Sequence, residues 1–389
     1  MATAHVNGIT VGYDDEGTGA PLLLVHGHPF DRTMWAPQTS AFAARGYRVI
    51  APDLRGFGDT TGADGATDFS DFARDLAALL DFLGVEKAVV GGLSMGGQIV
   101  MDFCRLYPER LLGVVLADTF PGAETPRSRA DRLATADRLE REGMGPWAEE
   151  ALDKMVAPYN VKDLPDVADH VRRMMHGAPV TGAVLAHRAR AERPDYRDTL
   201  RALAVPALVV TGVDDPYTPV ADGELMRDLI PDAELCLVEG AAHMPNLERT
   251  GEFDAALRRF LARVTLPPVN GYRHAVRARG EHVVVSGQIA LDHAGRVVGE
   301  GDADAQARQV FRNLDKALTA QGATFADVVK LNIFVTDMAV MPAVRRARDE
   351  WIDTANPPAS SAVRVSGFIR PELLVEIDAQ AVVAPTGQE

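Results

Sequence analysis

The sequence predicts an α/β protein with a mostly parallel sheet and a helical cap, followed by a smaller α+β domain. Three observations lead to this fold class. Short, nearly continuous apolar runs alternate with helical patterns over the first 265 residues. One long segment among them, residues 121–200, is helical throughout and interrupts the alternation. Beyond a Pro-Pro pair at 267–268, the order of strands and helices changes.

The apolar runs of the first part have the length of strands. Runs of this kind are typical of strands that are buried on both faces of a parallel sheet. The predicted strands are 21–27, 47–53, 87–94, 111–118, 206–212 and 233–240. Residues 8–19 precede them, and we interpret this stretch as the hairpin of an antiparallel edge.

Helical patterns separate the predicted strands. Between residues 69 and 83 the apolar side chains fall on one face of a helix, and Gly84 ends it. The segment 121–200 is rich in Arg, Asp, Glu and Ala and carries no strand signal. It is long enough to form a cap over the carboxyl edge of the sheet, where open α/β sheets bind ligands.

Residues 266–270 are predicted to link two domains, because Pro267 and Pro268 end the preceding helix and stiffen the join. Beyond them we expect strands at 282–291, 328–337, 361–367 and 373–383, and helices at 302–322 and 339–352. The chain therefore divides into a domain at 1–265 and a second domain at 271–389, which has about the commonest domain size.

Composition and charge exclude several classes of function. A hydrophobic content of 47% and a charged content of 24% are ordinary for a soluble globular protein. The net charge of −15 repels nucleic acid and anionic lipid, so we expect neither as a partner. We find no signal-peptide pattern and no apolar run of membrane-spanning length, and the two cysteines, Cys104 and Cys236, cannot form a disulfide framework. These features predict a cytoplasmic protein with a small-molecule substrate.

The stretch Gly92-Leu93-Ser94-Met95-Gly96 fits the pattern G-x-S-x-G, with a predicted strand before it and a predicted helix after it. One interpretation is an ordinary βα turn, and the other is a nucleophilic serine held on a strained turn. In the second case the serine has an unfavourable backbone conformation, and side chains two residues away would collide with neighbouring backbone. The strand and helix on either side favour a nucleophile at Ser94.

A serine hydroxyl is a poor nucleophile without a base. The turn after strand 206–212 carries Asp214 and Asp215, and the turn after strand 233–240 carries His243. Ser94 and these residues all follow strand carboxyl ends, so they can converge. We expect His243 to take the serine proton, while an aspartate holds the imidazole tautomer and stabilises its charged form.

Residues 1–265 resemble the α/β-hydrolase family, through "HGHP", "PDLRGFGDT", "GLSMGG", "GVDDPYTP" and "AAHMPNLE". The resemblance implies that Asp215 is the acid, with Asp214 as the alternative. It also implies an oxyanion hole made by the N–H groups of His28 and Met95, which would stabilise the charge of a tetrahedral intermediate.

The resemblance leaves the substrate open. Ser94 argues against the related dehalogenases and epoxide hydrolases, which have Asp at this position. The start of the chain and the helical cap resemble the enol-lactonase, carbamate/aminoacrylate hydrolase and non-haem haloperoxidase branches. The candidate substrate contacts are the His28 side chain, Trp35 and the cap residues 121–200; a His28 used for its backbone alone is the alternative. We interpret His26 as structural, and we expect no metal and no cofactor.

Residues 271–385 resemble the RidA (YjgF) reactive-intermediate deaminase family, through "VVVSGQIALD", "NPPASSAVRV" and "LLVEIDAQA". The family fold is chorismate-mutase-like, with a sheet backed by two helices. The resemblance implies trimers with ligand sites between subunits. The strands 328–337 and 373–383 also carry more apolar residues than two helices are expected to bury, which again predicts a homo-oligomer, most simply a trimer.

This second domain departs from the family at one position. Deaminase members have Arg in "P-A-R-S", where it clamps the substrate carboxylate. Here the residue is Ser360, and Arg364 lies about 13 Å further along the strand. We therefore expect this domain to serve in assembly, or to bind some other ligand, rather than to deaminate imines.

Three functions fit these observations. The first is a serine hydrolase that cleaves a small ester or lactone through an acyl-enzyme. The second is a hydrolase of a carbamate or another C–N bond in nitrogen catabolism, motivated by the fusion of these two families. The third is a non-catalytic receptor that keeps the hydrolase fold and uses the second domain as an assembly platform.

Overall fold

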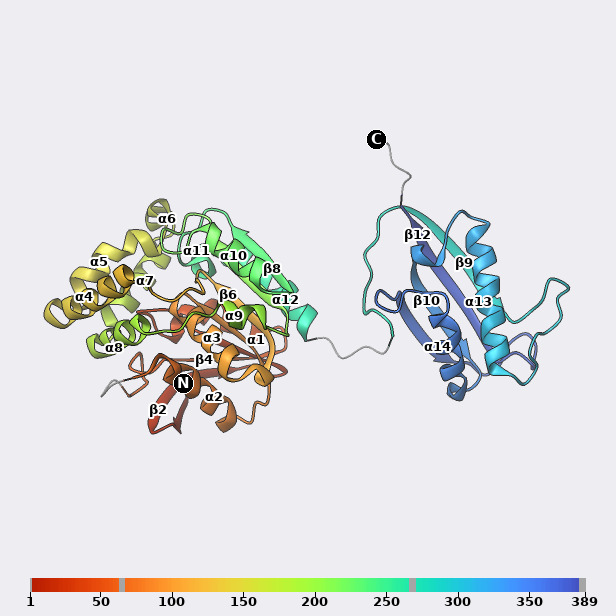
Figure 1. Ribbon diagram of the computed structural model, residues 1–389, viewed down its shortest axis with the longest axis horizontal. Helices are drawn as coiled ribbons and strands as arrows, with labels where there is room; N and C mark the ends of the chain where they lie inside the picture. Colours follow the sequence, from red (N-terminus) through yellow and green to blue (C-terminus); the bar gives the residue numbers. More distant parts are fainter. Residues whose placement is uncertain (1, 63–66, 266–270, 385–389) are drawn as a thin grey trace. The chain divides into compact units, whose positions relative to one another are not determined.

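The computed structural model describes residues 2–62, 67–265 and 271–384. It divides the chain into two compact units, Met1–Leu266 and Pro267–Glu389 (Figure 1). The predicted linker, 266–270, lies outside the described residues. Each unit has a hydrophobic core of its own.

In the described part of the first unit, eight strands form one sheet in the order β1-β2-β4-β3-β5-β6-β7-β8. The pairs β1–β2 and β2–β4 are antiparallel, and all the others are parallel. The strands are β1 (Ala2–Val6), β2 (Ile9–Glu16), β3 (Ala20–Val25), β4 (Tyr47–Pro52), β5 (Ala88–Leu93), β6 (Leu111–Ala117), β7 (Ala207–Gly212) and β8 (Ala233–Val238).

Helices cover both faces of this sheet. Outside the cap they are α1 (Ala36–Ala43), α2 (Phe69–Phe82), α3 (Met95–Leu106), α10 (Val220–Leu229), α11 (Pro245–Glu248) and α12 (Thr250–Val264). Along β3, Leu22 and Leu24 point into the core under α1 and α12, whereas Leu23 and Val25 point into the core under α2 and α3. Because successive side chains of a strand point to opposite faces, a strand covered on both sides must be apolar at every position.

Two strand predictions need correction. The predicted hairpin at 8–19 is instead the strand β2 and the turn after it; the hairpin partner is β1, and the connecting turn has positive φ at both Asn7 and Gly8, as the right-handed twist of a hairpin requires. Strand β8 was expected to be buried on both faces, yet it pairs only with β7 among the described strands and is half-exposed along most of its length.

The segment between β6 and β7 is helical and contains the predicted cap. Its helices are α4 (Pro126–Glu142), α5 (Met144–Met155), α6 (Pro158–Asp163), α7 (Pro165–Gly177), α8 (Val180–Ala191) and α9 (Arg197–Arg201). Helices α4 to α8 gather at one end of the first unit, beyond the carboxyl ends of the parallel strands (Figure 1). None of the helices in the described residues is both long and apolar enough to cross a membrane.

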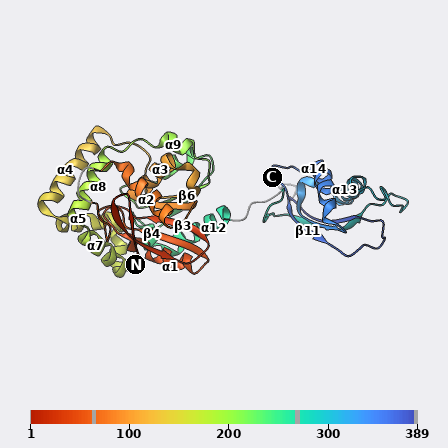
Figure 2. The ribbon, with the colours of Figure 1, turned by 90° about the horizontal axis from the view of Figure 1, so that it is seen from below.

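In the described residues 271–384, four strands form a second sheet in the order β11-β10-β12-β9. Its elements are β9 (Glu281–Ile289), α13 (Ala303–Thr319), β10 (Val328–Val335), α14 (Met341–Asp349), β11 (Ala359–Arg364) and β12 (Val375–Val383). Only the β10–β11 pair is parallel. Both helices lie on one face of the sheet (Figure 2). The predicted fold class is therefore confirmed in both units.

The apolar residues of β10 and β12 are divided between the two faces of this sheet. The side chains that face the helices, such as Leu331 and Ile377, are all buried by α13 and α14. The opposite face carries polar residues, Asn332 and Asp378 among them, together with a few exposed apolar side chains. The two helices therefore cover one face of the four strands and leave the apolar side chains of the opposite face uncovered.

Candidate active site

Ser94 stands on the sharp turn between β5 and α3. Its backbone has φ 59° and ψ −118°, a conformation that is rare for any residue with a side chain. The strain is held in place from two sides. The Ser94 N–H donates to the carbonyl of Ala117 at 2.9 Å, and the Thr119 hydroxyl donates to the carbonyl of Ser94 at 2.8 Å. Both partners follow or end β6, so the neighbouring strand maintains the turn.

The two glycines of the motif are required by close backbone contacts. A Cβ atom on Gly92 would lie 2.4 Å from the carbonyl group of Gly96, and a Cβ atom on Gly96 would lie 2.3 Å from the carbonyl oxygen of Val25. Neither backbone can move without disturbing β3 or α3. The spacing of glycine around Ser94 thus has the steric origin that the sequence analysis assumed.

His243 and Asp215 form a buried hydrogen-bonded pair at the ends of β8 and β7. The His243 Nδ1–H donates to Asp215 Oδ2 at 2.7 Å. The hydroxyl of Thr218 donates to the same oxygen, and the Tyr217 N–H donates to Oδ1 at 2.8 Å. Burial raises the pKa of Asp215, but the charge of His243 and these hydrogen bonds outweigh it and lower the pKa below its ordinary value. Asp214 is exposed and instead accepts a hydrogen bond from Tyr159 of the cap.

A second aspartate, Asp118, lies beside this pair and was not singled out by the sequence analysis. Its Oδ1 accepts the Gly212 N–H at 2.8 Å, while its buried Oδ2 has no partner among the described residues. Burial and the charge of Asp215 raise the pKa of Asp118 well above its ordinary value, so of these two carboxyl groups Asp118 is the harder one to ionise. The one signal in the sequence was its position at the carboxyl end of β6, next to the elbow.

Asp118, Asp215 and His243 are also the one group among the described residues whose acidic and imidazole atoms lie close enough together to hold a metal ion, within 4.8 Å of one another. The hydrogen bond between His243 and Asp215 already accounts for the closeness of those two residues. The His243 nitrogen nearest the carboxylates carries the proton that Asp215 accepts, and a ligating nitrogen must be unprotonated.

A cavity of about 150 Å³ opens between the sheet and the cap. The lining residues from the sheet side are His28, Ser94, Gln98, Asp118, Thr119, Phe120, Tyr217, Thr218 and His243. Those from the cap are Arg132, Trp147, Met155, His187 and Arg190. Ser94 and His243 therefore face the same enclosed space, and its volume restricts the occupant to a small molecule.

The two predicted oxyanion donors lie beside the nucleophile. Met95 is the first residue of α3, where an N–H group has no acceptor within the helix and the helix dipole favours negative charge. His28 is in the loop after β3. Among the described residues, the backbone N–H groups of His28 and Met95 have no hydrogen-bond acceptor. Both remain available to a developing oxyanion.

The His28 ring has a role beyond its backbone, because it contacts the cap. Its Nε2 lies 3.3 Å from the carbonyl of Ala183, and its ring centroid lies 4.4 Å from that of His187. Burial, together with the nearby His187 and Arg190, holds the pKa of His28 well below its ordinary value, so the ring is neutral. The side chain thus lines the cavity, as one of the two interpretations expected.

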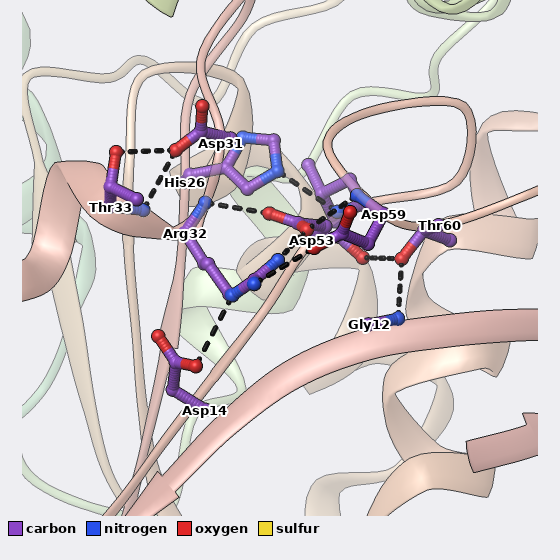
Figure 3. Close-up of polar contacts among 10 residues, drawn as sticks. Gly12, Asp14, His26, Asp31, Arg32, Thr33, Asp53, Asp59 and Thr60 are labelled. Atoms are coloured by element: carbon purple, nitrogen blue, oxygen red, sulfur yellow. Dashed lines mark hydrogen bonds and ion pairs between the residues drawn. The ribbon is translucent and has the colours of Figure 1, made fainter. Parts of the chain in front are cut away.

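The loop that carries His28 is fixed to the loop after β4 by a cluster around Arg32 and Asp53 (Figure 3). The Arg32 N–H donates to Asp53 Oδ1 at 2.8 Å, and its guanidinium forms ion pairs with Asp53, Asp14 and Asp59. His26 joins the same two loops. Its Nε2 accepts a backbone N–H of the second loop at 2.9 Å, which leaves Nδ1 to donate to the Gly27 carbonyl. Arg32, Asp53 and His26 therefore position the loop that carries His28, and none of the three lines the cavity.

Glu248 connects the cap with the loop of His243. One carboxylate oxygen accepts the Ala242 N–H at 2.9 Å, next to His243. The other accepts the Ala157 N–H and the Asn160 side chain, both at 2.8 Å, from the cap. A single buried carboxylate thus fixes the histidine loop and the start of α6 relative to each other.

The expected contact between Trp35 and substrate is not found. Trp35 is 1% exposed and lies in the core beside Phe253, outside the cavity. Its place is taken by Trp147 of α5, which lines the cavity and meets the His28 ring edge to face. The sequence does not distinguish the two tryptophans, because burial depends on how the cap folds back over the sheet.

In the second unit, Ser360 occupies the place where the family has its arginine. Its buried Oγ has no partner among the described residues. Arg364 does not reach it, since the Arg364 Nε donates to the carbonyl of Thr336 at 3.2 Å. The backbone of Arg273 pairs with Ala359, next to Ser360, but among the described residues no side chain forms a hydrogen bond with the Ser360 hydroxyl.

Comparison with protein families agrees with this division of the chain. A model described as "alpha/beta hydrolase fold" matches residues 20–250. A model described as "Endoribonuclease L-PSP" matches residues 263–383, the part that resembles RidA.

Individual relatives match the first unit. A 3-oxoadipate enol-lactonase from Acinetobacter baylyi is 30% identical over 59% of this chain and 84% of its own length. The structure of a thermophilic esterase from Thermogutta terrifontis, described as malate bound, is 37% identical and superposes with a TM-score of 0.66, covering 68% of this chain and 99% of that one. An enol-lactonase from Burkholderia xenovorans LB400 is 27% identical, with a TM-score of 0.62 over 67% of this chain and 100% of that one. Other relatives are named as non-heme haloperoxidases or as carbamate hydrolases.

Proposed function

Because the chain belongs to the α/β-hydrolase fold family and also carries a RidA-family domain, we propose that it is a serine hydrolase acting on a small-molecule ester or lactone. Ser94 is the nucleophile, His243 the general base and Asp215 the residue that orients His243. The proposal assigns the chemistry to the first unit and an assembly role to the second.

The observation that carries the proposal is the shared cavity of Ser94 and His243. Asp215 accepts the His243 Nδ1–H, so in the neutral ring Nε2 is the nitrogen that can accept a proton from the Ser94 hydroxyl. A receptor needs neither a strained serine nor a buried histidine–carboxylate pair, and strain of this kind is retained at sites where it serves a mechanism.

The reaction follows from these roles. Ser94 Oγ attacks the carbonyl carbon, His243 takes the hydroxyl proton, and the N–H groups of Met95 and His28 stabilise the oxyanion. When the intermediate collapses, the alcohol leaves with the proton from His243 and an acyl-enzyme remains. Water, activated by His243, then releases the acid and restores Ser94. In a lactone the alcohol and the acid belong to the same molecule, so one ring-opened product results.

The choice of ester or lactone rests on cavity size and relatives. The cavity of about 150 Å³ accepts a small acyl group but no polymer. The relatives whose identities are given above are an esterase and two enol-lactonases, and their names give esters and lactones as substrates.

A carbamate or another C–N substrate is the second candidate. Its support is the similarity of the first unit to proteins named as carbamate hydrolases, together with the fusion to a domain of the RidA family. The same triad would serve, with an amine in place of the alcohol as the leaving group.

For the second unit we propose assembly into a homo-oligomer, most simply a trimer. The support is the open face of its sheet, where Val284 and Val363 are 76% and 49% exposed although both lie within strands. Ser360 removes the charge that a carboxylate substrate of the deaminase type would need, so catalysis in this unit has no comparable support.

The test is a panel of small esters, lactones and carbamates, assayed with the full chain and with Ser94→Ala. Hydrolysis by the wild type that Ser94→Ala abolishes supports the proposal, and the preferred substrate class decides between oxygen and nitrogen leaving groups. A fluorophosphonate probe should label the wild type at Ser94. Labelling at another residue, or turnover that survives Ser94→Ala, would contradict the assignment.

A further inference from the structure

The cap side of the active-site cavity holds more positive charge than its own carboxylates neutralise. Three arginines lie on this side, and one buried carboxylate, Glu124, forms ion pairs with two of them. Arg132 and Arg193 both form ion pairs with Glu124, and Arg193 also stacks on Phe120 at 4.7 Å. Arg190 of α8 has no ion pair with any described residue, although it is among the buried residues of the protein.

Within the described part of the chain, Arg190 makes one hydrogen bond. Its Nε donates to the side-chain oxygen of Gln98 at 3.0 Å. Burial, followed by the charges of Arg132 and Arg193, lowers the pKa of Arg190 well below that of a free guanidinium. A buried charge without a counterion costs several kcal/mol, so it is seldom kept unless a ligand completes it.

Other unsatisfied donors line the cavity next to this guanidinium. The Gln98 Nε2 group is buried and has no partner among the described residues, and neither ring nitrogen of His187 has one. Gln98 is 1% exposed and His187 is 7% exposed, and both line the cavity. Burial and the nearby arginines lower the pKa of His187 to about 3, so its ring is a neutral donor and adds no second charge.

Gln98 lies close to the nucleophile Ser94, at the start of α3. Gln98 lies on α3 four residues after Ser94, and its N–H donates to the Ser94 carbonyl at 3.2 Å. Ser94 directly precedes the helix, and its side chain and that of Gln98 line the same cavity. A group held by Gln98 and Arg190 is therefore only a few bonds from a carbonyl carbon at Ser94.

We propose that Arg190 and Gln98 form a carboxylate-binding subsite, and that the substrate is an ester or lactone carrying a carboxylate a few bonds from its scissile carbonyl. The planar guanidinium, with Nε occupied by Gln98, presents its remaining N–H groups to two carboxylate oxygens, and the Gln98 amide adds another donor. This inference rests on the proposed function, since it names the substrate class of the same site.

The catalytic test compares two matched esters, 4-nitrophenyl hydrogen glutarate and 4-nitrophenyl valerate, which differ by the terminal carboxylate. We expect the wild type to prefer the glutarate ester in kcat/KM. In Arg190→Gln that preference should fall about 10- to 100-fold, the range for a charge-assisted hydrogen bond, and Arg190→Lys should restore part of it. Arg188→Gln is the control: it lies on the same helix, is 49% exposed and pairs with Asp137 and Glu140, so the preference should not change.

The binding test does not need turnover. Glutarate should stabilise the full-length Ser94→Ala variant against thermal unfolding, and the stabilisation should be lost in Ser94→Ala/Arg190→Gln but kept in Ser94→Ala/Arg188→Gln. If the wild type hydrolyses neither ester yet glutarate binds through Arg190, the proposed function fails and the subsite stands. Hydrolysis of both esters without preference, or an equal loss on both in Arg190→Gln, would overturn the subsite and leave the hydrolase intact.

Discussion

The two sheets of this protein are covered in different ways. The sheet of the first unit has helices on both faces, and its strands β3, β5 and β7 are buried almost completely. The sheet of the second unit has α13 and α14 on one face only (Figure 2), and Val284 stands 76% exposed on β9. A sheet buried on both sides is complete within one chain, whereas an open face can still bind a partner.

The difference extends to the sites. In the first unit the groups of the proposed mechanism come from one chain. Ser94, His28 and His243 line one cavity, and Asp215 is hydrogen-bonded to His243. In the second unit the position of the family's arginine holds a serine hydroxyl without a partner among the described residues. We infer that the first unit can act alone and that the second acts through association. Variants in each unit can test this contrast.

The largest effect should come from the nucleophile and its base. Ser94→Ala and His243→Ala should each lower kcat by about 10⁴-fold or more, because proton transfer and attack occur as one unit. The double variant should be little worse than either single variant. Steady-state hydrolysis and thermal unfolding of the same samples check this; losses that multiply in the double variant would mean that the two residues do not act together.

The three aspartates around His243 should differ strongly. Asp215→Asn should lower kcat by about 10³- to 10⁴-fold, because an amide cannot hold the charged imidazolium as the carboxylate does. Asp214→Asn should change kcat by less than about threefold, since that residue is exposed and bonded to Tyr159. Asp118→Asn should also have a small effect, because burial and the charge of Asp215 raise the pKa of Asp118 and so favour its neutral form, which an amide resembles. A large loss in Asp214→Asn with a small one in Asp215→Asn would move the acid to Asp214.

Association should depend on the second unit alone. Light scattering should report an oligomer, most simply a trimer, for the full chain and a monomer for the first unit, residues 1–266. Val284→Glu and Val363→Glu should weaken association by placing charge on the open face. Leu237→Glu is the matched control, since this residue is 43% exposed on β8 of the first unit. A truncated first unit that forms the same oligomer would place the interface on the other sheet.

The smallest effect concerns stability. Arg190→Met should raise the free energy of unfolding by about 1–3 kcal/mol, because it removes a buried cation that has no counterion. For a unit of this size that is a rise of about 2–4 °C in Tm for each kcal/mol. Calorimetry of the two proteins without ligand measures it. A lower Tm in Arg190→Met would indicate that the guanidinium is stabilised by contacts inside the cap and is not kept for a ligand.

The local steps of the fold could be predicted from the sequence because their causes are local. Glycines two residues on either side of Ser94 reflect backbone contacts within one turn, and they can be recognised without knowing what lies around them. The same holds for the apolar strands, whose composition reflects burial on two faces. The exposure of β8 could not be predicted, because the sequence of a strand does not show whether other strands lie on both sides of it.

The placement of Ser94 on an elbow, of His243 and an aspartate after later strands, and of two joined domains could be predicted from the sequence alone. Which groups near the site lack partners among the described residues depends on the tertiary structure. Asp118 lies beside Asp215, Trp147 takes the place expected for Trp35, and Glu124 neutralises two arginines while Arg190 remains unpaired. These outcomes depend on distances between residues far apart in the chain and on the exclusion of water. Burying a charge raises the free energy of the folded state only where neither water nor a nearby polar group solvates that charge.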